Sequence, residues 1–565
     1  SKNDGISAWS TIVSLAESPK QPGLLYVGTD DGLVQMTRDG GKTWTNITSR
    51  LPGFPAGAFI SEVVPSAFDV GTVYITVDNH RLNDFAPYAW VSSDFGATFR
   101  AINGGLAGEV VRTLTEDTKN ADVLYVGTET GIFLTLDRGR TWRRLKANLP
   151  TVRVDEITIH PRDNAMLVAT HGRSIFVLDH LEPIQEYTRT VAASESRLFS
   201  IPAALQMKGK DDRNDEFWGH QTFIGENPPN DAVIQFNVKG SAKALLVRIS
   251  SGTQMVREVA VPANKNKAGI QTVCWDMRSS PNEAVAGAAA GGFGGRAGGG
   301  GGAGGGPGGP GGARPVPGVR APLPTPGYLP LNPCAAGGPD GGPGGGGGGG
   351  GFGGFGGGAN AGPYVTPGNY TVALVAGGKV IDSRPMRVIG DPEVRFAVAE
   401  RAAYDKLVTD LHAAQGRGNA VASRLNTLGT QIAIAKSKLD STKNVSDAAK
   451  AKLDALEQAF DGIRVKFGVA EGRVPGARPT PGQGGGGGGG FGRGGGNPDD
   501  ALGRVGIVKN ALIGVWEAPS AGTRAQAMAA TAALEAAMRE APAVFGMVAG
   551  VNDALKPSGL TLQVP

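Results

Sequence analysis

The sequence predicts a multidomain, mainly β protein with a partial β-propeller, an immunoglobulin-like β-sandwich and a C-terminal α-helical bundle. Three observations predict this fold. An octapeptide recurs three times within residues 37–142, alternating apolar strands fill the middle of the chain, and helical periodicity begins near residue 393. With 565 residues the chain is also too long for one hydrophobic core, so several domains are expected.

The first region, residues 1–187, consists of similar units. Segments 12–29, 60–77, 111–128 and 154–170 each contain an alternating apolar strand, a polar turn and a second apolar run, which is the pattern of a β-hairpin. A third strand then leads into the octapeptide, whose final aromatic residue begins a fourth strand. Units of four antiparallel strands that recur every ~40–50 residues are typical of propeller blades.

The octapeptide is TRDGGKTW at 37–44, SSDFGATF at 92–99 and TLDRGRTW at 135–142. We expect its Asp to accept backbone N–H bonds within its own turn, its Gly to adopt a positive φ, its Thr to bond locally and its aromatic ring to pack between blades. Repetition argues against catalysis, because an active site needs only one constellation. The residues with these structural roles are Asp39, Gly41, Thr43, Trp44, Asp94, Gly96, Thr98, Phe99, Asp137, Gly139, Thr141 and Trp142.

This octapeptide resembles the Asp-box, or BNR repeat, of sialidases, sortilin-type receptor domains, xyloglucanases and photosystem-assembly propellers. The stretches VDNHRLNDFAPYAWVSSDFG and HPRDNAMLVATHGRSIFVLD more specifically resemble large secreted bacterial proteins, often described as sortilin-like or glycosyl-hydrolase-like. The resemblance covers about residues 1–185 and implies a propeller of more than the four visible blades. We therefore expect residues 1–187 to be C-terminal blades, completed by blades upstream or in another chain, since an open arc exposes sheet edges.

The second region, residues 188–392, keeps the two-residue period of strands and predicts the immunoglobulin-like sandwich. A Gly-rich insertion at 280–362 has too few large side chains for a packed core. It is either a flexible loop or polyglycine that becomes ordered by packing against copies of itself, which would support self-association. Cys274 lies on an expected strand and Cys334 in the insertion, so they could form a disulfide in an oxidising compartment.

The third region, residues 393–565, has the periodicity of a helical bundle. Segments 398–417, 419–439 and 446–467 predict helices, and segments 499–516 and 523–555 predict two or three more. A Gly-rich loop at 475–497 interrupts the pattern.

Composition argues against several function classes. The chain has 55 Lys and Arg against 51 Asp and Glu and no basic patch, so we expect no nucleic-acid partner. No apolar run reaches the length of a transmembrane segment. Because neither a zinc-type Cys/His spacing nor a phosphate-binding loop is present, we expect no metal and no cofactor.

Two loops hold the densest polar and aromatic candidates for binding. The first contains His80, Arg81, Asp84, Tyr88 and Trp90, and it could equally be a loop that packs on itself. The second contains His171 and Arg173. No motif marks the carboxylate pair of a glycosidase, so no catalytic residue is assigned.

These patterns favour a secreted, periplasmic or cell-surface scaffold or binding protein without enzymatic activity, whose partner is a protein or a glycan. The first alternative is a glycoside hydrolase of the BNR propeller type, with catalytic carboxylates partly in missing blades. The second is an assembly factor or subunit of a membrane-associated complex.

Overall fold

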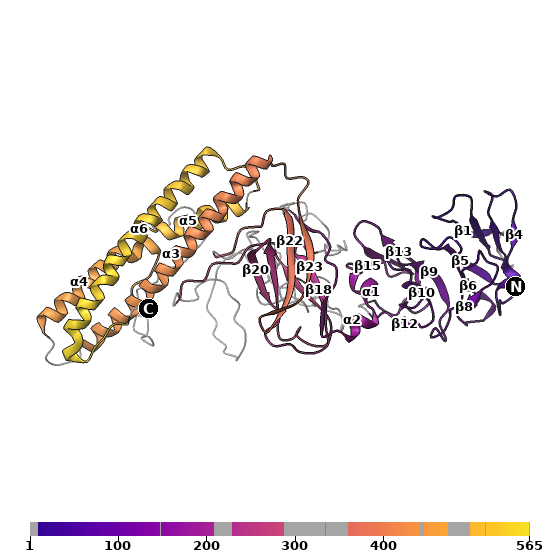
Figure 1. Ribbon diagram of the computed structural model, residues 1–565, viewed down its shortest axis with the longest axis horizontal. Helices are drawn as coiled ribbons and strands as arrows, with labels where there is room; N and C mark the ends of the chain where they lie inside the picture. Colours follow the sequence, from indigo (N-terminus) through magenta and orange to yellow (C-terminus); the bar gives the residue numbers. More distant parts are fainter. Residues whose placement is uncertain are drawn as a thin grey trace, which may run out of the picture.

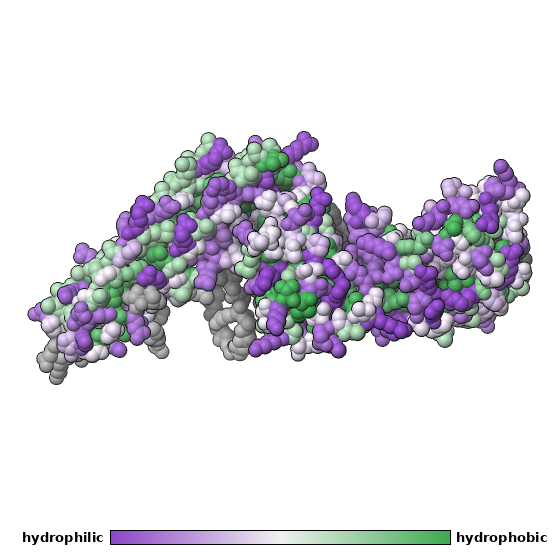
Figure 2. All heavy atoms as spheres, in the orientation of Figure 1, coloured by the Kyte–Doolittle hydropathy of each residue, from purple (hydrophilic) through white to green (hydrophobic). Residues whose placement is uncertain are grey.

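The computed structural model describes residues 10–146, 149–207, 229–286, 334, 360–439, 446–472, 498–514 and 516–563. Along an elongated molecule, small β-sheets come first, a pair of larger sheets follows, and long helices form the other end (Figure 1). The mainly β fold with a C-terminal helical region is therefore confirmed. Hydrophilic residues cover most of the face drawn in Figure 2, with small hydrophobic patches between them.

Four antiparallel sheets, here called blades 1 to 4, form the N-terminal part of the molecule. In each blade the strands follow one another in chain order, as propeller blades do. Blade 1 contains β1 (Ile12–Glu17), β2 (Leu25–Thr29), β3 (Val34–Thr37) and β4 (Thr45–Asn46), and blade 2 contains β5 (Phe59–Pro65), β6 (Val73–Asp78), β7 (Tyr88–Ser92) and β8 (Arg100–Ala101). Blade 3 contains β9 (Val111–Glu116), β10 (Leu124–Thr128), β11 (Ile132–Thr135) and β12 (Arg143–Arg144), and blade 4 contains β13 (Val154–His160), β14 (Ala165–Thr170) and β15 (Ile175–Leu178). Short 3₁₀ helices η1 (Thr48–Arg50) and η2 (His80–Leu82) lie in the connections.

A separate hydrophobic core lies between each pair of successive blades. Blades 1 and 2 share one core, blades 2 and 3 a second, and blades 3 and 4 a third. The first strand of every blade pairs with the second through a register shift, which is a β-bulge near the start of the first strand. In blades 2, 3 and 4 the bulge turns two residues three positions apart to the same side, toward the preceding blade. They are Ile60 and Val63 of β5, Val111 and Leu114 of β9, and Val154 and Ile157 of β13.

The chain leaves blade 4 through α1 (Glu182–Glu186) and α2 (Arg189–Ala193). A buried polar network fixes α1 against blades 3 and 4. The Gln185 side-chain amide donates to both carboxylate oxygens of Asp117, at 3.1 and 3.0 Å, and Asn164 donates to Glu182 at 2.8 Å.

Two sheets in the middle of the chain enclose one core around the buried Trp275. One sheet has the order β16 (Ser196–Leu198), β18 (Ala232–Val238), β21 (Gly269–Trp275). The other has the order β17 (Ala204–Gln206), β23 (Lys379–Gly390), β22 (Gly368–Ala376), β19 (Leu246–Ser251), β20 (Gln254–Ala260). Sequence periodicity did not predict β16 or β17, because three residues are too few to establish a period. β17 pairs in parallel with β23, unlike the antiparallel pairs around it.

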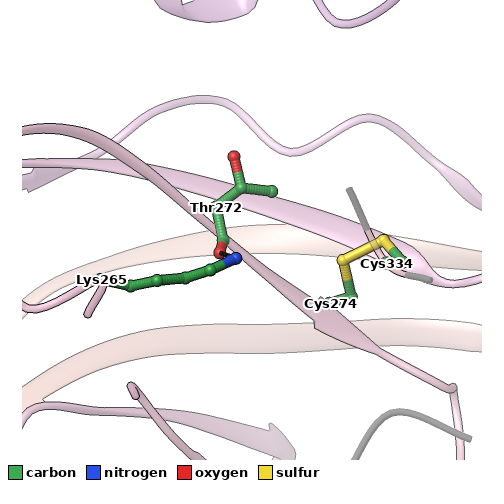
Figure 3. The surroundings of a disulfide bond; sticks show 4 residues. All are labelled: Lys265, Thr272, Cys274 and Cys334. Atoms are coloured by element: carbon green, nitrogen blue, oxygen red, sulfur yellow. Dashed lines mark hydrogen bonds between the residues drawn. A yellow bond between two sulfur atoms is a disulfide. The ribbon is translucent and has the colours of Figure 1, made fainter. Parts of the chain in front are cut away.

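A disulfide joins Cys274 on β21 to Cys334, with 5.7 Å between their Cα atoms (Figure 3). The buried Lys265 lies nearby and donates from Nζ to the Thr272 carbonyl at 2.9 Å. The disulfide therefore connects the sandwich to a point within the Gly-rich insertion. Residues 287–333 and 335–359 lie outside the described residues. The two alternatives for the insertion, a flexible loop and an ordered polyglycine segment, concern these residues and stay predictions.

The helical region contains α3 (Val398–Leu439), α4 (Asp447–Arg464), η4 (Val465–Phe467), α5 (Ala501–Gly514), α6 (Ala521–Leu555) and η5 (Lys556–Ser558). The prediction of two helices across 398–439 is wrong, because α3 continues through Gly416 and Gly418. A Cβ at Gly418 would lie 2.6 Å from Leu502 on α5 and 3.2 Å from Leu534 on α6, so this glycine permits close helix packing. The 475–497 loop lies outside the described residues. Among the described helices, none is long and apolar enough to span a membrane.

Both ends of the insertion contact the helical region. Asn419 of α3 donates to the Glu283 carbonyl at 2.8 Å, and Lys509 of α5 donates to the Ala361 carbonyl at 2.9 Å. Thr366 donates to Asp405 of α3 at 2.6 Å. These bonds fix the two large regions against each other on either side of the insertion.

Candidate binding site

The three octapeptide aspartates are bound within their own turns. In each copy one carboxylate oxygen accepts the backbone N–H, and the other accepts the hydroxyl, of the Thr four residues later, at 2.6–2.9 Å. Hydrogen bonds from Thr43 lower the pKa of Asp39 to about 2, and those from Thr98 do the same for Asp94. A carboxylate held in this way is a turn former, so these residues are not part of the candidate site.

The octapeptide glycines and aromatic residues join successive blades. Gly41, Gly96 and Gly139 all have positive φ, as expected. A Cβ at Gly96 would lie 2.9 Å from Ile47 of the preceding unit, and one at Gly139 would lie 2.8 Å from Ile102. Trp142 is buried between blades 2 and 3, and Phe99 packs on the core between blades 1 and 2. Trp44 differs, because its ring is 42% exposed and its Nε1 donates to Gly41 within its own turn.

The loop that carries the first group of predicted binding residues packs largely on itself. Asp84 accepts hydrogen bonds from Asn79 at 2.8 Å and from the Tyr88 hydroxyl at 2.7 Å. The Tyr88 ring stacks on Trp90 with 5.8 Å between centroids, and Trp90 is buried. Burial and the bond to Asp84 raise the pKa of Tyr88 to about 12. Arg81 lies over the Phe59 ring at 5.4 Å. Only His80 of this group belongs to the cluster described next.

A row of charged and imidazole side chains crosses blades 2, 3 and 4 where their first strands begin and their second strands end. We call it the charged row. Its residues are Asp78, His80, Arg112, Glu129, Arg153, Asp155 and His171. Antiparallel pairing places the start of each first strand beside the end of the second, which brings these positions together.

Ion pairs connect members of the row within each blade and from blade 2 to blade 3. His80 Nδ1 lies 2.6 Å from Asp78 Oδ1, and Arg112 of blade 3 donates to the other oxygen of Asp78. Arg112 also lies 3.5 Å from Glu129. In blade 4, Arg153 Nε donates to Asp155 Oδ1 at 2.6 Å, and His171 Nδ1 lies 3.4 Å from Asp155 Oδ2.

Electrostatics and exposure differ along the row. Burial opposes ionisation of Asp155, but the hydrogen bond and charge of Arg153 hold the pKa of Asp155 below its ordinary value. The Asp78 side chain is only 5% exposed, whereas that of His171 is 67% exposed. The blade 2 end is therefore a fixed ion pair, and the blade 4 end offers donors and acceptors to a ligand.

Sequence reasoning found two members of the row and missed five. His80 and His171 were predicted, and both lie in it. Arg173 was also predicted, but it is exposed on the turn after β14 and makes no ion pair with the described residues. A signal for the missed residues exists in the aligned repeats. Asp78, Glu129 and His171 lie at equivalent positions at the ends of second strands, Asp78 as the last strand residue and the other two directly after the strand. Arg112 and Asp155 are both the second residue of a first strand.

A buried carboxylate beside the row is not free to react. Burial raises the pKa of Glu62 to about 7, which is the range of a general acid. Its Oε2, however, accepts the backbone N–H of Leu114 in the next blade at 2.6 Å, so Glu62 joins blades 2 and 3. In the part of the chain that the structure describes, no cluster of His, Cys, Asp or Glu could hold a metal ion.

A family model described as Sortilin, neurotensin receptor 3, matches residues 88–197. This part of the chain is sortilin-like. The sortilin-like segment contains blade 3, blade 4 and five of the seven residues of the charged row. No curated protein matches the chain.

Solved propeller structures resemble the chain at low identity. YCF48 bound to a D1 peptide is 17% identical over 30% of this chain and 50% of its own, with a TM-score of 0.23. The GH74 xyloglucanase from Xanthomonas campestris is 16% identical over 41% of this chain and 34% of its own, with a TM-score of 0.27. A GH74 enzyme from Niastella koreensis is 16% identical over 31% of this chain and 29% of its own, with a TM-score of 0.25. The match thus spans half the length, or less, of each of these three proteins.

Proposed function

We propose that the chain is a non-enzymatic binding or scaffold protein that engages a protein or a glycan through the charged row. The observation that carries this proposal is the presence of two groups of ion pairs along one row. One group joins His80, Asp78, Arg112 and Glu129 of blades 2 and 3, and the other joins Arg153, Asp155 and His171 of blade 4. Loops and strand ends held by a rigid scaffold are the usual location of binding residues.

The chemistry of the row suits a polar ligand of mixed character. Arginine donors and carboxylate acceptors alternate along it, so hydroxyl, amide, ammonium and carboxylate groups all find partners. Its formal charge nearly cancels, which does not favour a polyanion. Glycans and peptide backbones match this alternation of donors and acceptors.

The test uses the intact chain on glycan and peptide arrays. A variant that combines Arg153→Ala and His171→Ala should lose at least tenfold in affinity for the ligand that the unmodified chain selects. Arg162→Ala is a matched control, since its exposed ion pair with Asp163 lies outside the row. Equal binding by the double variant and the control would refute the proposal.

A glycoside hydrolase is the competing proposal, because the row contains three carboxylates beside two histidines. It predicts release of sugar from a polysaccharide panel, abolished by single Asp→Ala or Glu→Ala changes in the row. An assembly factor or subunit of a membrane-associated complex, the third candidate, predicts copurification with that complex from solubilised membranes.

The finer features belong to the same proposal. We propose domain boundaries at 187/188 and 392/393, an immunoglobulin-like class for the two-sheet region, and a propeller completed by a second chain or by further blades. The Cys274–Cys334 disulfide supports a secreted, periplasmic or cell-surface location, where disulfides persist. Self-association through the Gly-rich tracts is part of the scaffold proposal.

A further inference from the structure

The octapeptide turns lie at the end of each blade that is opposite the charged row. The row lies where second strands end, whereas each octapeptide follows the end of a third strand. Because neighbouring strands run antiparallel, these two places are at opposite ends of a blade. The fourth strands β8 and β12, which follow the octapeptides of blades 2 and 3, lie at the lower edge of the blades in Figure 1.

Arginines gather at the octapeptide end of blades 2 and 3. Segments 92–101 and 135–144 together contain five arginines and two aspartates, with neither lysine nor glutamate. One of the arginines, Arg144, donates to the Thr130 carbonyl, beside Glu129 of the charged row. The other four are exposed and lie on β8, on β12 or in the turn before β12. We call these four the basic rim: Arg100, Arg138, Arg140 and Arg143.

Contacts between blades 2 and 3 bring Arg100 close to the other members of the rim. Its Nη2 donates to the Arg138 carbonyl at 3.3 Å. A Cβ on Gly104, just after β8, would lie 3.3 Å from the Arg140 carbonyl. The expectation that the chain has no basic patch is therefore wrong, because folding joins Arg100 to an arginine-rich segment 38 residues later.

The positive charge of the rim is only partly offset by its neighbours. Within the part of the chain that the structure describes, Arg100, Arg140 and Arg143 make no ion pair. Arg138 pairs with Asp122 at 2.7 Å, and both side chains are more than half exposed. The two octapeptide aspartates keep their charge, but their oxygens are occupied by the threonines of their own turns. Three guanidinium groups are thus open to an anion, which would also relieve their mutual repulsion.

We propose that the basic rim binds an acidic polysaccharide, a linear glycan with carboxylate or sulfate groups repeated along its chain. A guanidinium group pairs with such anions through two parallel N–H···O bonds. The rim extends from one blade to the next, so an extended polymer can contact Arg100 and then Arg140 and Arg143. This surface is additional to the charged row, whose charges nearly cancel.

Other polyanions fit the rim less well. Single-stranded nucleic acids bind through exposed aromatic rings on which bases stack, but Trp142 is 6% exposed and the Arg38 guanidinium covers the Phe95 ring at 3.8 Å. A membrane surface requires several apolar side chains that insert beside the charges. Among residues 92–101 and 135–144, the exposed large apolar side chain is Leu136, at 36%.

Binding of the intact chain to defined polymers tests the proposal. The charged probes are polygalacturonate and dextran sulfate, and their uncharged counterparts are methyl-esterified polygalacturonate and dextran. Calorimetry should detect binding of a charged probe and of neither counterpart. Binding should weaken as NaCl rises from about 50 to 500 mM, because salt screens exposed charges. Failure of both charged probes, equal binding of a probe and its counterpart, or tighter binding of poly(A) RNA or phosphatidylglycerol vesicles would overturn the proposal.

Arginine variants locate the site on the rim. The triple variant Arg100→Ala, Arg140→Ala, Arg143→Ala should lose about tenfold or more in affinity for the charged polymer. The matched control removes the same charge from exposed residues of the helical region, and it should keep the affinity; it is Lys450→Ala, Arg539→Ala, Lys556→Ala. Equal melting temperatures of the two variants show that the triple variant is folded. Arg143→Glu alone should weaken binding in the same direction, which keeps the test valid if the triple variant does not fold.

One further variant separates the rim from the charged row. The Arg153→Ala, His171→Ala chain should bind the charged polymer as the unmodified chain does, whatever its effect on the ligand of the row. Loss of binding in this chain would assign the polymer to the row and overturn the proposal for the rim. Equal binding by the arginine triple variant and its lysine and arginine control would overturn it as well.

Discussion

Asp78 at the end of β6 accepts a hydrogen bond from Arg112 of β9, so an ion pair connects blade 2 to blade 3. The Asp78 side chain is 5% exposed, and His80 occupies its other oxygen. The pair thus has a structural role at the blade 2 end of the charged row, while the blade 4 end is open to solvent.

Removing the arginine should destabilise the propeller region. Arg112→Ala leaves the Asp78 carboxylate buried with only His80 as its ionic partner, and we expect a loss of about 3 kcal/mol in the free energy of unfolding. Hydrogen exchange of β6 and β9 measures this loss locally. Arg162→Ala removes the exposed ion pair with Asp163 and should change the free energy of unfolding by less than about 0.5 kcal/mol. An equal effect of the two substitutions would contradict the structural role of Arg112.

The octapeptide turn should weaken in acid. The folded-state pKa of Asp94 is about 2, below the ordinary value near 3.9, so its contribution to stability is present above about pH 4 and is lost as the pH falls toward 2. Asp94→Ala should remove about 1 kcal/mol at neutral pH and reduce the acid dependence of blade 2. Urea titrations at pH 7, 4 and 2.5 compare the variant with the unmodified chain, and parallel pH profiles would argue against this role of the carboxylate.

The disulfide should stabilise the two-sheet region. Cys274 and Cys334 are 60 residues apart, and a closed loop of that length constrains the unfolded chain by about 4 kcal/mol in the entropic model. Calorimetry with and without reductant should show a lower melting temperature for this region after reduction. The Cys274→Ser, Cys334→Ser double variant serves as the control, since its melting should not respond to reductant.

Lys509 should make the junction with the helical region more stable in mild alkali. Burial lowers the pKa of Lys509 to about 8, while an unfolded lysine titrates near 10.4. Between these values the unfolded state binds more protons, so stability rises with pH, by about 2 kcal/mol from pH 7.5 to 10. Denaturant midpoints across this range measure the slope. Lys509→Met should abolish it, and a slope that persists in the variant would assign it to other groups.

The sequence alone determined the repeating elements. Alternation of apolar residues predicted the hairpins of all four blades, and the spacing of Asp39, Asp94 and Asp137 predicted three octapeptide turns, because these features depend on residues close together in the chain. Helical periodicity likewise predicted the C-terminal region. The pattern predicted a helix break that does not exist, because Gly416 and Gly418 are poor helix formers locally. In the structure α3 continues through both, and the space that a side chain at Gly418 would need is filled by Leu502 of α5 and Leu534 of α6.

Only the tertiary structure decided what the repeats bring together. Asp78 and Arg112 come from two different blades, and no local pattern marks them as partners, because their proximity arises from the packing of one blade on the next. The exposure of Ile12 and Leu15 is also a tertiary property, since their sequence is that of buried equivalents in the other blades. Local sequence sets which strands and turns form, whereas contacts between distant segments set which charges pair and which apolar faces remain open.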